Sequence, residues 1–331
     1  MKIFYIPIEP YETRYTADWI QQFENEFDSN GVQYETILGD TFSNKVTTGG
    51  VLDACGTHVY KFTQLQKLIT KLNAHEVNDG DVIFFADLWF PGIESLFYIR
   101  NMIGVKFKIC GIFHAGTYDN YDFTCRNNMR NWGKWLEASW FSEIDKIFVA
   151  TNFHKQLLLK GSIIIPRLAD KIFVTGLPFY GKELRDRYIT KKENIIVFPH
   201  RLDEEKHPEL FDLFVDKLTQ NRFDFKAIRT IEETNSREEY FSILGKSKIM
   251  LSFADQETFG YSTLESMALD NIVIVPNKLS YKETVPNSYR YDTLDEAFNM
   301  LTSGLLYYQK PNYNNCFIKW ADSINRMLAL L

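Results

Sequence analysis

The sequence contains few cysteines, and none of them is placed to pair with another nearby. Only four occur in 331 residues, and no two form a CxxC motif. This spacing argues against a zinc site and against a disulfide framework. It favours a protein of the reducing cytoplasm, and we expect no metal.

The chain also lacks a long apolar run. No stretch approaches the roughly 20 apolar residues that cross a bilayer, so we expect no membrane insertion. The apolar start, residues 1–8, is too short for a signal segment and is followed at once by Glu9 and Glu12. We interpret it as a first strand.

Neither sign of charge dominates. Lys and Arg number 37 and Asp and Glu 43, for a formal net charge of −6, and 45% of the residues are hydrophobic. This composition is typical of a globular protein and argues against a surface that binds polyanions throughout, while leaving room for a local basic patch. The length exceeds that of one hydrophobic core, so two domains of roughly 150 residues are expected.

Short β-branched or aromatic runs alternate with segments of helical period, which predicts βα units and mostly parallel sheets. Strands are expected at 2–8, 33–37, 81–86, 106–113, 146–150 and 171–174, and in a second series at 194–198, 223–228, 248–253 and 272–275. The clearest helices are expected at 15–28, 63–73 and 132–141. A final helix is expected at 315–331, and the N-terminal domain is one candidate for its packing partner.

A polar stretch at 178–187, opened by Gly176 and Pro178, predicts the domain junction. The fold class is therefore α/β, with two Rossmann-like domains at 1–180 and 181–331.

The segment 252–268 is the most informative for chemistry. An apolar strand ends at Phe253, a polar loop carries Glu257 and Gly260, and a helix begins near Ser262. In such sheets ligands bind beyond the carboxyl ends of strands, and the N–H groups of the following helix attract phosphate. Glu257 and Glu265 can bracket that phosphate, one accepting from sugar hydroxyls and the other from ribose hydroxyls. The alternative is that both carboxylates are solvated.

A second segment, 197–208, carries Arg201 and Lys206 on a strand-to-helix loop. Arginine supplies a planar fork and lysine a point charge, and both can converge on a diphosphate. The alternative is a surface pair between Lys206 and Asp203 or Glu204.

These two segments resemble the E-x7-E and R-x4-K segments of retaining, family 4-like glycosyltransferases of the GT-B fold. The resemblance implies two Rossmann-like domains that face a central cleft, with the acceptor held by 1–180 and a nucleotide-sugar donor, a UDP-sugar, held by 181–331. It implies no further cofactor and no required metal. It assigns Glu257 to the donor sugar as a catalytic residue, Glu265 to the ribose, Arg201 and Lys206 to the departing diphosphate, and the segment Thr258, Phe259, Gly260, Tyr261 and Ser262 to the diphosphate backbone contacts.

The acceptor side rests on two strand ends. His114 follows the strand at 106–113, and Asp87 follows the strand at 81–86. We interpret His114 as a group that positions the sugar or acceptor and Asp87 as a base or acceptor ligand. The alternatives are a structural histidine and a helix cap.

The loop 9–16 lacks the glycines usual in the family after the first strand, and Arg14 is expected to replace their backbone amides. This loop, with 114–119 and 148–155, resembles glycosyltransferases encoded in phage genomes, some of which are thought to modify phage DNA. That implies a hydroxymethylated pyrimidine in double-stranded DNA as the acceptor, the host cytoplasm as the location, and Tyr118 among the acceptor contacts.

One internal segment fits a nucleic-acid acceptor. Residues 123–136 contain Arg126, Arg130 and Lys134, no acidic residue, and the interleaved rings of Trp132 and Trp135. Cations can follow phosphates while rings stack on an extruded base. The alternative is an amphipathic helix with buried Trp rings and solvated cations.

Other functions stay open at this point. They are a sugar-nucleotide epimerase or a phosphorylase on a similar scaffold, transfer to a polysaccharide or lipid-linked sugar, and a non-catalytic module that binds sugar nucleotides or DNA. Neither the sugar, the nucleotide nor the anomeric outcome can be read from the sequence.

Overall fold

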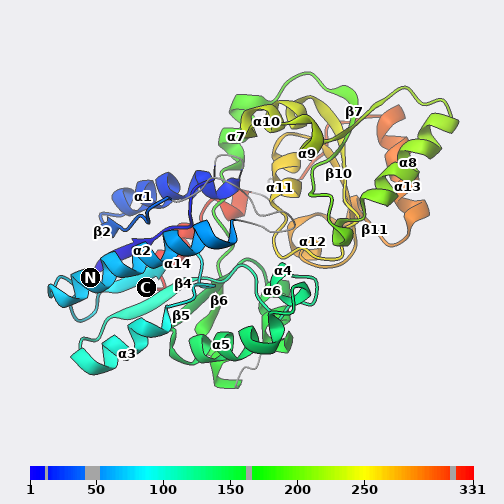
Figure 1. Cartoon of the computed structure of the whole chain (residues 1–331). Helices are drawn as coiled ribbons and strands as arrows, with labels where there is room; N and C mark the ends of the chain where they lie inside the picture. Colours follow the sequence, from blue (N-terminus) through cyan, green and yellow to red (C-terminus); the bar gives the residue numbers. More distant parts are fainter. Residues whose placement is uncertain (12–13, 42–52, 162–165, 314–317) are drawn as a thin grey trace. The chain divides into compact units, whose positions relative to one another are not determined.

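The computed structural model describes residues 1–11, 14–41, 53–161, 166–313 and 318–331. The chain forms two compact units. Unit 1 comprises Met1–Ala150, His154–Gly176 and Ile324–Leu331, and unit 2 comprises Thr151–Phe153 and Leu177–Ser323. Each unit is a parallel sheet with helices on both faces (Figure 1). The prediction of two Rossmann-like domains is confirmed.

The sheet of unit 1 has six parallel strands in the order β2-β1-β3-β4-β5-β6. Their bounds are β1 Lys2–Ile6, β2 Gln33–Thr36, β3 Val82–Phe85, β4 Lys108–Ile112, β5 Lys146–Val149 and β6 Ile172–Val174. The central strands are apolar on both faces because both faces are covered.

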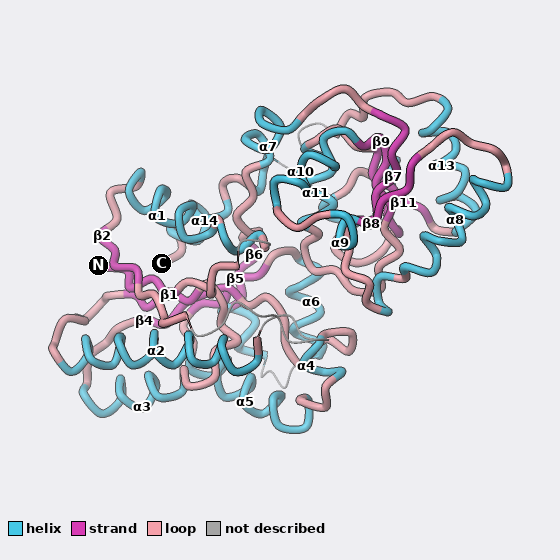
Figure 2. Tube along the Cα trace, turned by 45° about the horizontal axis from the view of Figure 1, so that its top comes forward, coloured by secondary structure: helices cyan, strands magenta, loops and turns pink. Residues whose placement is uncertain are grey.

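Helices cover the two faces of this sheet (Figure 2). One face packs on α2 (Ala54–Asn73), α3 (Glu94–Ile103) and α5 (Arg130–Glu143), and the other on α1 (Trp19–Ser29) and α14 (Ser323–Leu328). Two shorter or peripheral helices are α4 (Phe123–Arg126) and α6 (Asn152–Gly161).

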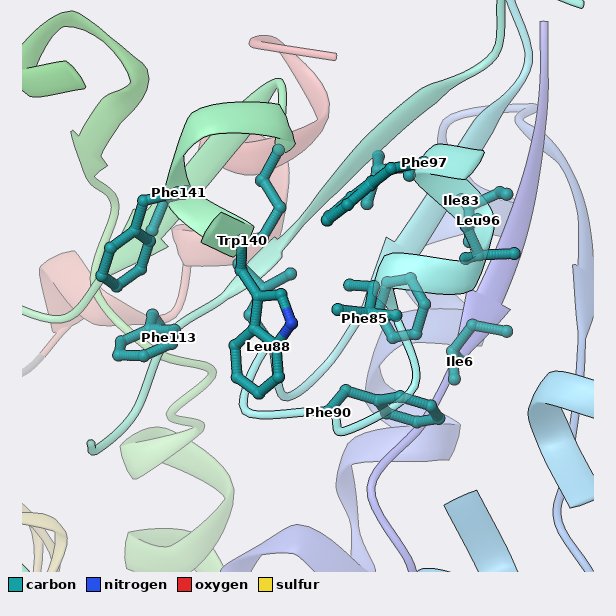
Figure 3. Packing of buried hydrophobic residues seen from close by; sticks show 14 of the residues in the cluster. Ile6, Ile83, Phe85, Leu88, Phe90, Leu96, Phe97, Phe113, Trp140 and Phe141 are labelled. Atoms are coloured by element: carbon teal, nitrogen blue, oxygen red, sulfur yellow. The ribbon is translucent and has the colours of Figure 1, made fainter. Parts of the chain in front are cut away.

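Aromatic rings, which make up 15% of the residues, fill both layers between the sheet and its helices. On the α1 face, the ring of Tyr5 lies 5.0 Å from that of Phe23 and 5.7 Å from that of Phe27. The opposite layer centres on Trp140, which is fully buried. Figure 3 shows its surroundings: Leu88, Phe85, Phe90, Phe97, Phe113 and Phe141.

The sheet of unit 2 has five parallel strands in the order β11-β10-β9-β7-β8. Their bounds are β7 Glu193–Phe198, β8 Lys226–Arg229, β9 Ser247–Leu251, β10 Ile272–Pro276 and β11 Arg290–Tyr291. Its helices are α7 Gly181–Tyr188, α8 Pro208–Gln220, α9 Thr230–Glu233, α10 Arg237–Lys246, α11 Tyr261–Ala268, α12 Tyr281–Thr284 and α13 Leu294–Leu306. Figure 2 shows α8 and α13 on one face and α7, α10 and α11 on the other.

Three local predictions differ from the structure. The polar stretch expected as a connecting segment contains the helix α7. Arg185 of this helix forms an ion pair with Asp270 at 2.6 Å. The two-residue strand β11 was not predicted because it is too short to show a period. The predicted final helix at 315–331 is reduced to a 3-10 turn, Ile318–Trp320, and the short α14, while residues 314–317 lie outside the described ranges.

In both sheets the strand order reverses at the first strand, so that later strands are added on both sides of it. In unit 2, β8 lies on one side of β7 and β9 on the other; in unit 1, β2 and β3 flank β1 in the same way. Ligands of open α/β sheets bind outside the carboxyl ends of the strands at such a switch point. The loops after β7 and β9, and those after β1 and β3, are therefore the expected ligand-binding loops of the two sheets.

Candidate functional site

The two segments predicted to hold the donor occupy the switch point of unit 2. The loop with Arg201 and Lys206 follows β7, and the loop with Glu257 and Gly260 follows β9, the neighbouring strand. The backbone N–H of Asp255 donates to the carbonyl of Glu205 at 2.8 Å. The fold therefore brings the two segments into direct contact.

Lys206 is buried against the second loop. Its ammonium donates to the carbonyl of Gln256 and lies 3.7 Å from Glu257 Oε2, and 7% of its side chain is exposed. The alternative of a surface pair with Asp203 or Glu204 is therefore wrong. The cation lies where the sequence predicts it, next to the turn before α11.

Arg201 has a different environment. Its guanidinium is 45% exposed and forms ion pairs with Asp203 at 3.0 Å and with Glu205 at 3.5 Å. Both partners lie on its own loop. Within the described residues, no hydrogen bond or ion pair joins Arg201 to the turn at 257–260, so its role toward a diphosphate stays a prediction.

The turn before α11 has the geometry of an anion cradle. Gly260 has a φ of 89°, a left-handed conformation that side-chain-bearing residues rarely adopt, and it precedes the first residue of the helix. At the start of α11 the N–H groups of Thr263 and Leu264 donate to the carbonyl of Gly260, at 3.1 Å and 2.9 Å, and a helix start directs its first N–H groups outward. A negatively charged group placed there would also be favoured by the helix dipole.

The neighbours of Gly260 are fixed by the core of unit 2. Phe259 is buried, with its ring 5.0 Å from that of Tyr261 and 5.3 Å from that of Trp320. Tyr261 donates to the carbonyl of Pro178 at 2.8 Å, and the carbonyl of Thr258 accepts from Thr151 at 2.9 Å. These contacts hold the loop in place, and Ser262 is half-buried. The contact of the 258–262 backbone with a diphosphate stays a prediction.

Glu265 lies inside the unit rather than on an exposed helix face. It is 5% exposed, accepts from the hydroxyl of Tyr240 at 2.8 Å and lies 3.9 Å from Arg237. The alternative of a solvated carboxylate is wrong. Its assignment to a ribose stays a prediction, because Tyr240 now competes for one of its oxygens.

The sequence reasoning missed His207, the residue after Lys206. Its Nδ1 lies 2.7 Å from Glu209 Oε1 and its Nε2 lies 2.8 Å from Asp255 Oδ2. These bonds raise the pKa of His207, with Asp255 the largest cause. Its position directly after the R-x4-K segment was the signal in the sequence that could have identified it.

At the switch point of unit 1, Asp87 is paired with a lysine that the sequence reasoning also missed. Lys61 Nζ, from α2, lies 3.0 Å from Asp87 Oδ2 and donates to the carbonyl of Trp89 at 2.6 Å. Asp87 Oδ1 accepts from the N–H of Trp89 at 3.1 Å. Asp87 thus lies at the expected strand end and accepts from the backbone two residues further on. The alternative of a helix cap is wrong, because the N-cap of α3 is Ile93.

His114 is held in one tautomer. Its Nε2 lies 2.8 Å from the carbonyl of Ala86, which can only accept, so Nε2 carries the hydrogen. Burial lowers the pKa of His114, and the charge of Lys61 lowers it further against the opposing effect of Asp87. The neutral ring then offers Nδ1 as an acceptor for a hydroxyl, which fits a positioning role.

Tyr118 was predicted as an acceptor contact, and the structure contradicts this. Its side chain is 3% exposed in the core of unit 1, and its hydroxyl lies 2.6 Å from Nε2 of the buried His154. Burial lowers the pKa of His154 to about 3, so this ring is a neutral hydrogen-bond partner. The hydroxyl of Tyr118 is thus used inside the fold.

Arg14 is half-buried at the start of the 3-10 turn Tyr15–Ala17, and its N–H donates to the carbonyl of Tyr11 at 2.9 Å. Residues 12 and 13 of the same predicted loop lie outside the described ranges. The replacement of glycine amides by Arg14 stays a prediction.

The basic and aromatic segment forms α4 and α5, and its two tryptophans are not buried. Trp132 is 49% exposed and Trp135 61% exposed, three residues apart on α5. Lys134 lies 5.3 Å from the ring of Trp135, Arg126 is exposed, and Arg130 contacts Asn120. The alternative with buried rings is wrong for these two residues, and we call this surface the α5 surface.

Within the described ranges, no three His, Cys, Asp or Glu side chains converge as a metal site would require. In the same part of the chain, every helix is too short or too polar to reach across a bilayer.

Solved structures with the same fold span the whole chain. The sucrose-phosphate synthase of Thermosynechococcus elongatus is 12% identical, with a TM-score of 0.64 over 98% of this chain and 94% of that one. The catalytic domain of starch synthase IV from Arabidopsis thaliana, bound to ADP and acarbose, is 12% identical, with a TM-score of 0.65 over 100% and 98%. An alpha-glucosyltransferase in complex with UDP is 11% identical, with a TM-score of 0.59 over 98% and 96%.

One curated sequence is similar over a shorter span. The tRNA-queuosine alpha-mannosyltransferase of Drosophila melanogaster is 30% identical over 121 residues, which cover 30% of this chain and 32% of that protein. The match thus spans about a third of that relative. No model of a protein family matches the chain. The structural neighbours are GT-B glycosyltransferases, and the predicted GT-B fold class is confirmed.

Proposed function

We propose that this protein is a retaining glycosyltransferase that moves a sugar from a nucleoside diphosphate sugar, a UDP-sugar, to an acceptor hydroxyl. The observation that carries the proposal is the contact between the buried Lys206 and the loop that leads through Gly260 into α11. This contact places a cation beside the start of a helix at the switch point of unit 2. Such an environment suits a diphosphate. Solved neighbours that contain UDP or ADP support the same donor class.

In the proposed reaction, the acceptor oxygen forms a bond to the anomeric carbon as the bond from that carbon to the diphosphate oxygen breaks. The acceptor proton passes to a phosphate oxygen of the departing diphosphate. Arg201, Lys206 and the N–H groups at the start of α11 stabilise the growing negative charge, which is the largest single source of catalysis in such reactions. Glu257 accepts from hydroxyls of the sugar and Glu265 from the ribose.

We propose a nucleic acid as the acceptor, specifically a hydroxymethylated pyrimidine in DNA. The exposed rings of Trp132 and Trp135 beside cations are the observation that favours it. A modified nucleoside in tRNA is a second candidate, favoured by the sequence match to a tRNA-queuosine mannosyltransferase.

The test is to incubate the protein with UDP-, ADP- and GDP-sugars and either hydroxymethylcytosine duplex DNA or tRNA, followed by mass spectrometry of the released nucleosides. We expect a hexose-shifted nucleoside in one arm only, with the anomeric configuration of the donor retained by NMR. Turnover of the donor without any acceptor would indicate an epimerase instead. Donor binding without transfer or slow hydrolysis would indicate a non-catalytic module, and transfer only to oligosaccharide or lipid-linked acceptors would overturn the nucleic-acid proposal.

A further inference from the structure

His207 lies between two carboxylates at the edge of the candidate donor site. Its Nδ1 lies 2.7 Å from Glu209 Oε1, and its Nε2 lies 2.8 Å from Asp255 Oδ2. Carboxylates that are ionised only accept hydrogen bonds, and a neutral imidazole has one N–H and one lone pair. Only the imidazolium donates to both partners, so the geometry fits the protonated ring.

This arrangement connects three loops of unit 2. Glu209 belongs to α8, which follows β7, and Asp255 belongs to the loop after β9. Asp255 also accepts from Lys278, in the loop after β10. The charged groups around the imidazole are thus Glu209, Asp255 and Lys278 from these elements, and Glu205 and Lys206 immediately before it in the chain.

The backbone supports the same placement. His207 has a φ of 54°, in the left-handed region between the 3-10 turn Glu204–Lys206 and α8. This conformation is uncommon for a residue other than glycine. From this position the imidazole of His207 contacts Asp255, on the loop that also carries Glu257.

We propose that protonated His207 is a positioning residue of the donor site, which holds the Asp255–Glu257 segment against the Arg201–Lys206 segment. We call this contact the His207 bridge. The proposal rests on the proposed function for its effect on the donor. Loss of the proton leaves one ring nitrogen with a lone pair facing a carboxylate, which loosens the contact and weakens donor binding.

The direction of the pH effect follows from the bonds. Both carboxylates raise the pKa of His207 above its ordinary value of about 6.5. The bridge is therefore complete below about pH 6.5 and is lost as the pH rises through the higher value in the folded protein. Donor affinity should fall in the same interval.

The experiment measures the dissociation constant of UDP-glucose, or of whichever nucleotide sugar the panel above selects, by calorimetry between about pH 6 and pH 8.5. A nucleotide sugar is used because its diphosphate diester does not titrate in this range. For the unchanged protein we expect affinity to fall about three- to tenfold across the range, as for the loss of one hydrogen bond of ordinary net strength. His207→Asn should bind weakly and without this pH dependence, since Asn tolerates the left-handed conformation and carries no charge.

The matched control is His75→Asn. His75 is also left-handed, with a φ of 58°, and it is exposed at the end of α2 in unit 1. This variant should keep the pH dependence of the unchanged protein. In turnover assays the effect of His207→Asn should appear in KM and leave kcat within about twofold. A pH dependence that survives in His207→Asn, or none in the unchanged protein, overturns the proposal.

Failure of the proposed function is a separate outcome. If no nucleotide sugar binds at any pH, that function is wrong, and the bridge is then judged by thermal midpoints. The difference in midpoint between the unchanged protein and His207→Asn should shrink as the pH rises through the pKa of His207. A difference in midpoint that stays constant with pH would contradict the His207 bridge.

Discussion

The ammonium nitrogen of Lys206 lies 3.7 Å from Glu257 Oε2, with both side chains largely withdrawn from solvent. The two residues come from different βα loops, and their proximity follows from the pairing of β7 with β9. The strand order therefore creates the contact between the basic and the acidic segment. The predictions below test what this part of the molecule does.

Glu257→Gln should lower donor turnover by about 100-fold, since a neutral amide accepts less strongly from sugar hydroxyls and removes a charge from the reacting centre. It should also lower the free energy of unfolding by about 1 kcal/mol, because the buried Lys206 loses its nearest anion. Steady-state kinetics and urea denaturation measure the two effects. Unchanged turnover would exclude Glu257 from the site.

Arg201→Ala should lower donor turnover by about 100-fold or more while leaving the thermal midpoint nearly unchanged. Its guanidinium is 45% exposed, and exposed ion pairs contribute about 0 to 1 kcal/mol. The matched control is Arg187→Ala on α7, where the side chain is 66% exposed and pairs with Glu238. Equal losses of activity in both variants would show that Arg201 has no special role.

Gly260→Ala should weaken donor binding and lower the free energy of unfolding by about 1 to 2 kcal/mol, because its φ of 89° disfavours a side chain. A Cβ there meets its nearest neighbours at 3.5 Å, so the effect comes from the backbone rather than from a clash. Gly80→Ala is the control, with a φ of 84° and open space around it in unit 1. A similar loss of stability in both variants, with weaker donor binding in Gly260→Ala alone, is the expected result.

The titration of His114 should leave the turnover number unchanged at neutral pH and should lower it as the pH falls through the pKa of the folded protein, which lies below the ordinary value of about 6.5. Burial lowers the pKa of this imidazole, so the neutral ring is the functional form and protonation removes its free lone pair. The contribution of His114 to stability is therefore present above the ordinary pKa and is lost as the pH falls through the lower value in the folded protein. His114→Gln should remove this acidic limb from both the turnover profile and the midpoint profile; a limb of the same size in the variant would contradict the assignment.

Trp132→Ala and Trp135→Ala should each weaken binding of oligonucleotide by about 1 to 3 kcal/mol, with little change in thermal midpoint. Trp132 and Trp135 are 49% and 61% exposed, and neither belongs to the buried core, so their removal costs little packing. Tyr98→Ala on α3, where the ring is 67% exposed, is the matched control. Fluorescence anisotropy at several salt concentrations measures the effect, and equal affinities in all three variants would remove the α5 surface from the nucleic-acid proposal.

Much of the fold was predictable because buried parallel strands form apolar runs that no helical period interrupts. The runs that became β3, β4 and β9 were found this way, although their predicted ends extended past the ladder into loop residues such as Ala86, Phe113 and Phe253. The direction in which a loop side chain points was not predictable. Tyr118 was expected to face the acceptor, but it lies in the core against His154.

The two candidate donor segments could be found because each carries charged residues at a fixed spacing along the chain, at the end of a predicted strand. The pairing of Lys61 with Asp87 could not be predicted, because Lys61 reaches Asp87 from the middle of α2, where a lysine ordinarily faces solvent. His207 was missed for a related reason, since its partner Asp255 becomes a neighbour only through the pairing of β7 with β9. Contacts between separate elements depend on the packing, which no local pattern encodes.

Residues Ile324–Leu331 belong to unit 1, although the chain reaches them from unit 2. Ile324 and Met327 are buried, and Lys108 of β4 donates to the carbonyl of Leu331 at 2.7 Å. A recombinant fragment that stops at Gly176 would lack this covering layer and expose part of its sheet. An exchange of the second unit between proteins of this architecture should therefore replace only the stretch from Leu177 to Ser323 and keep the last eight residues native to unit 1.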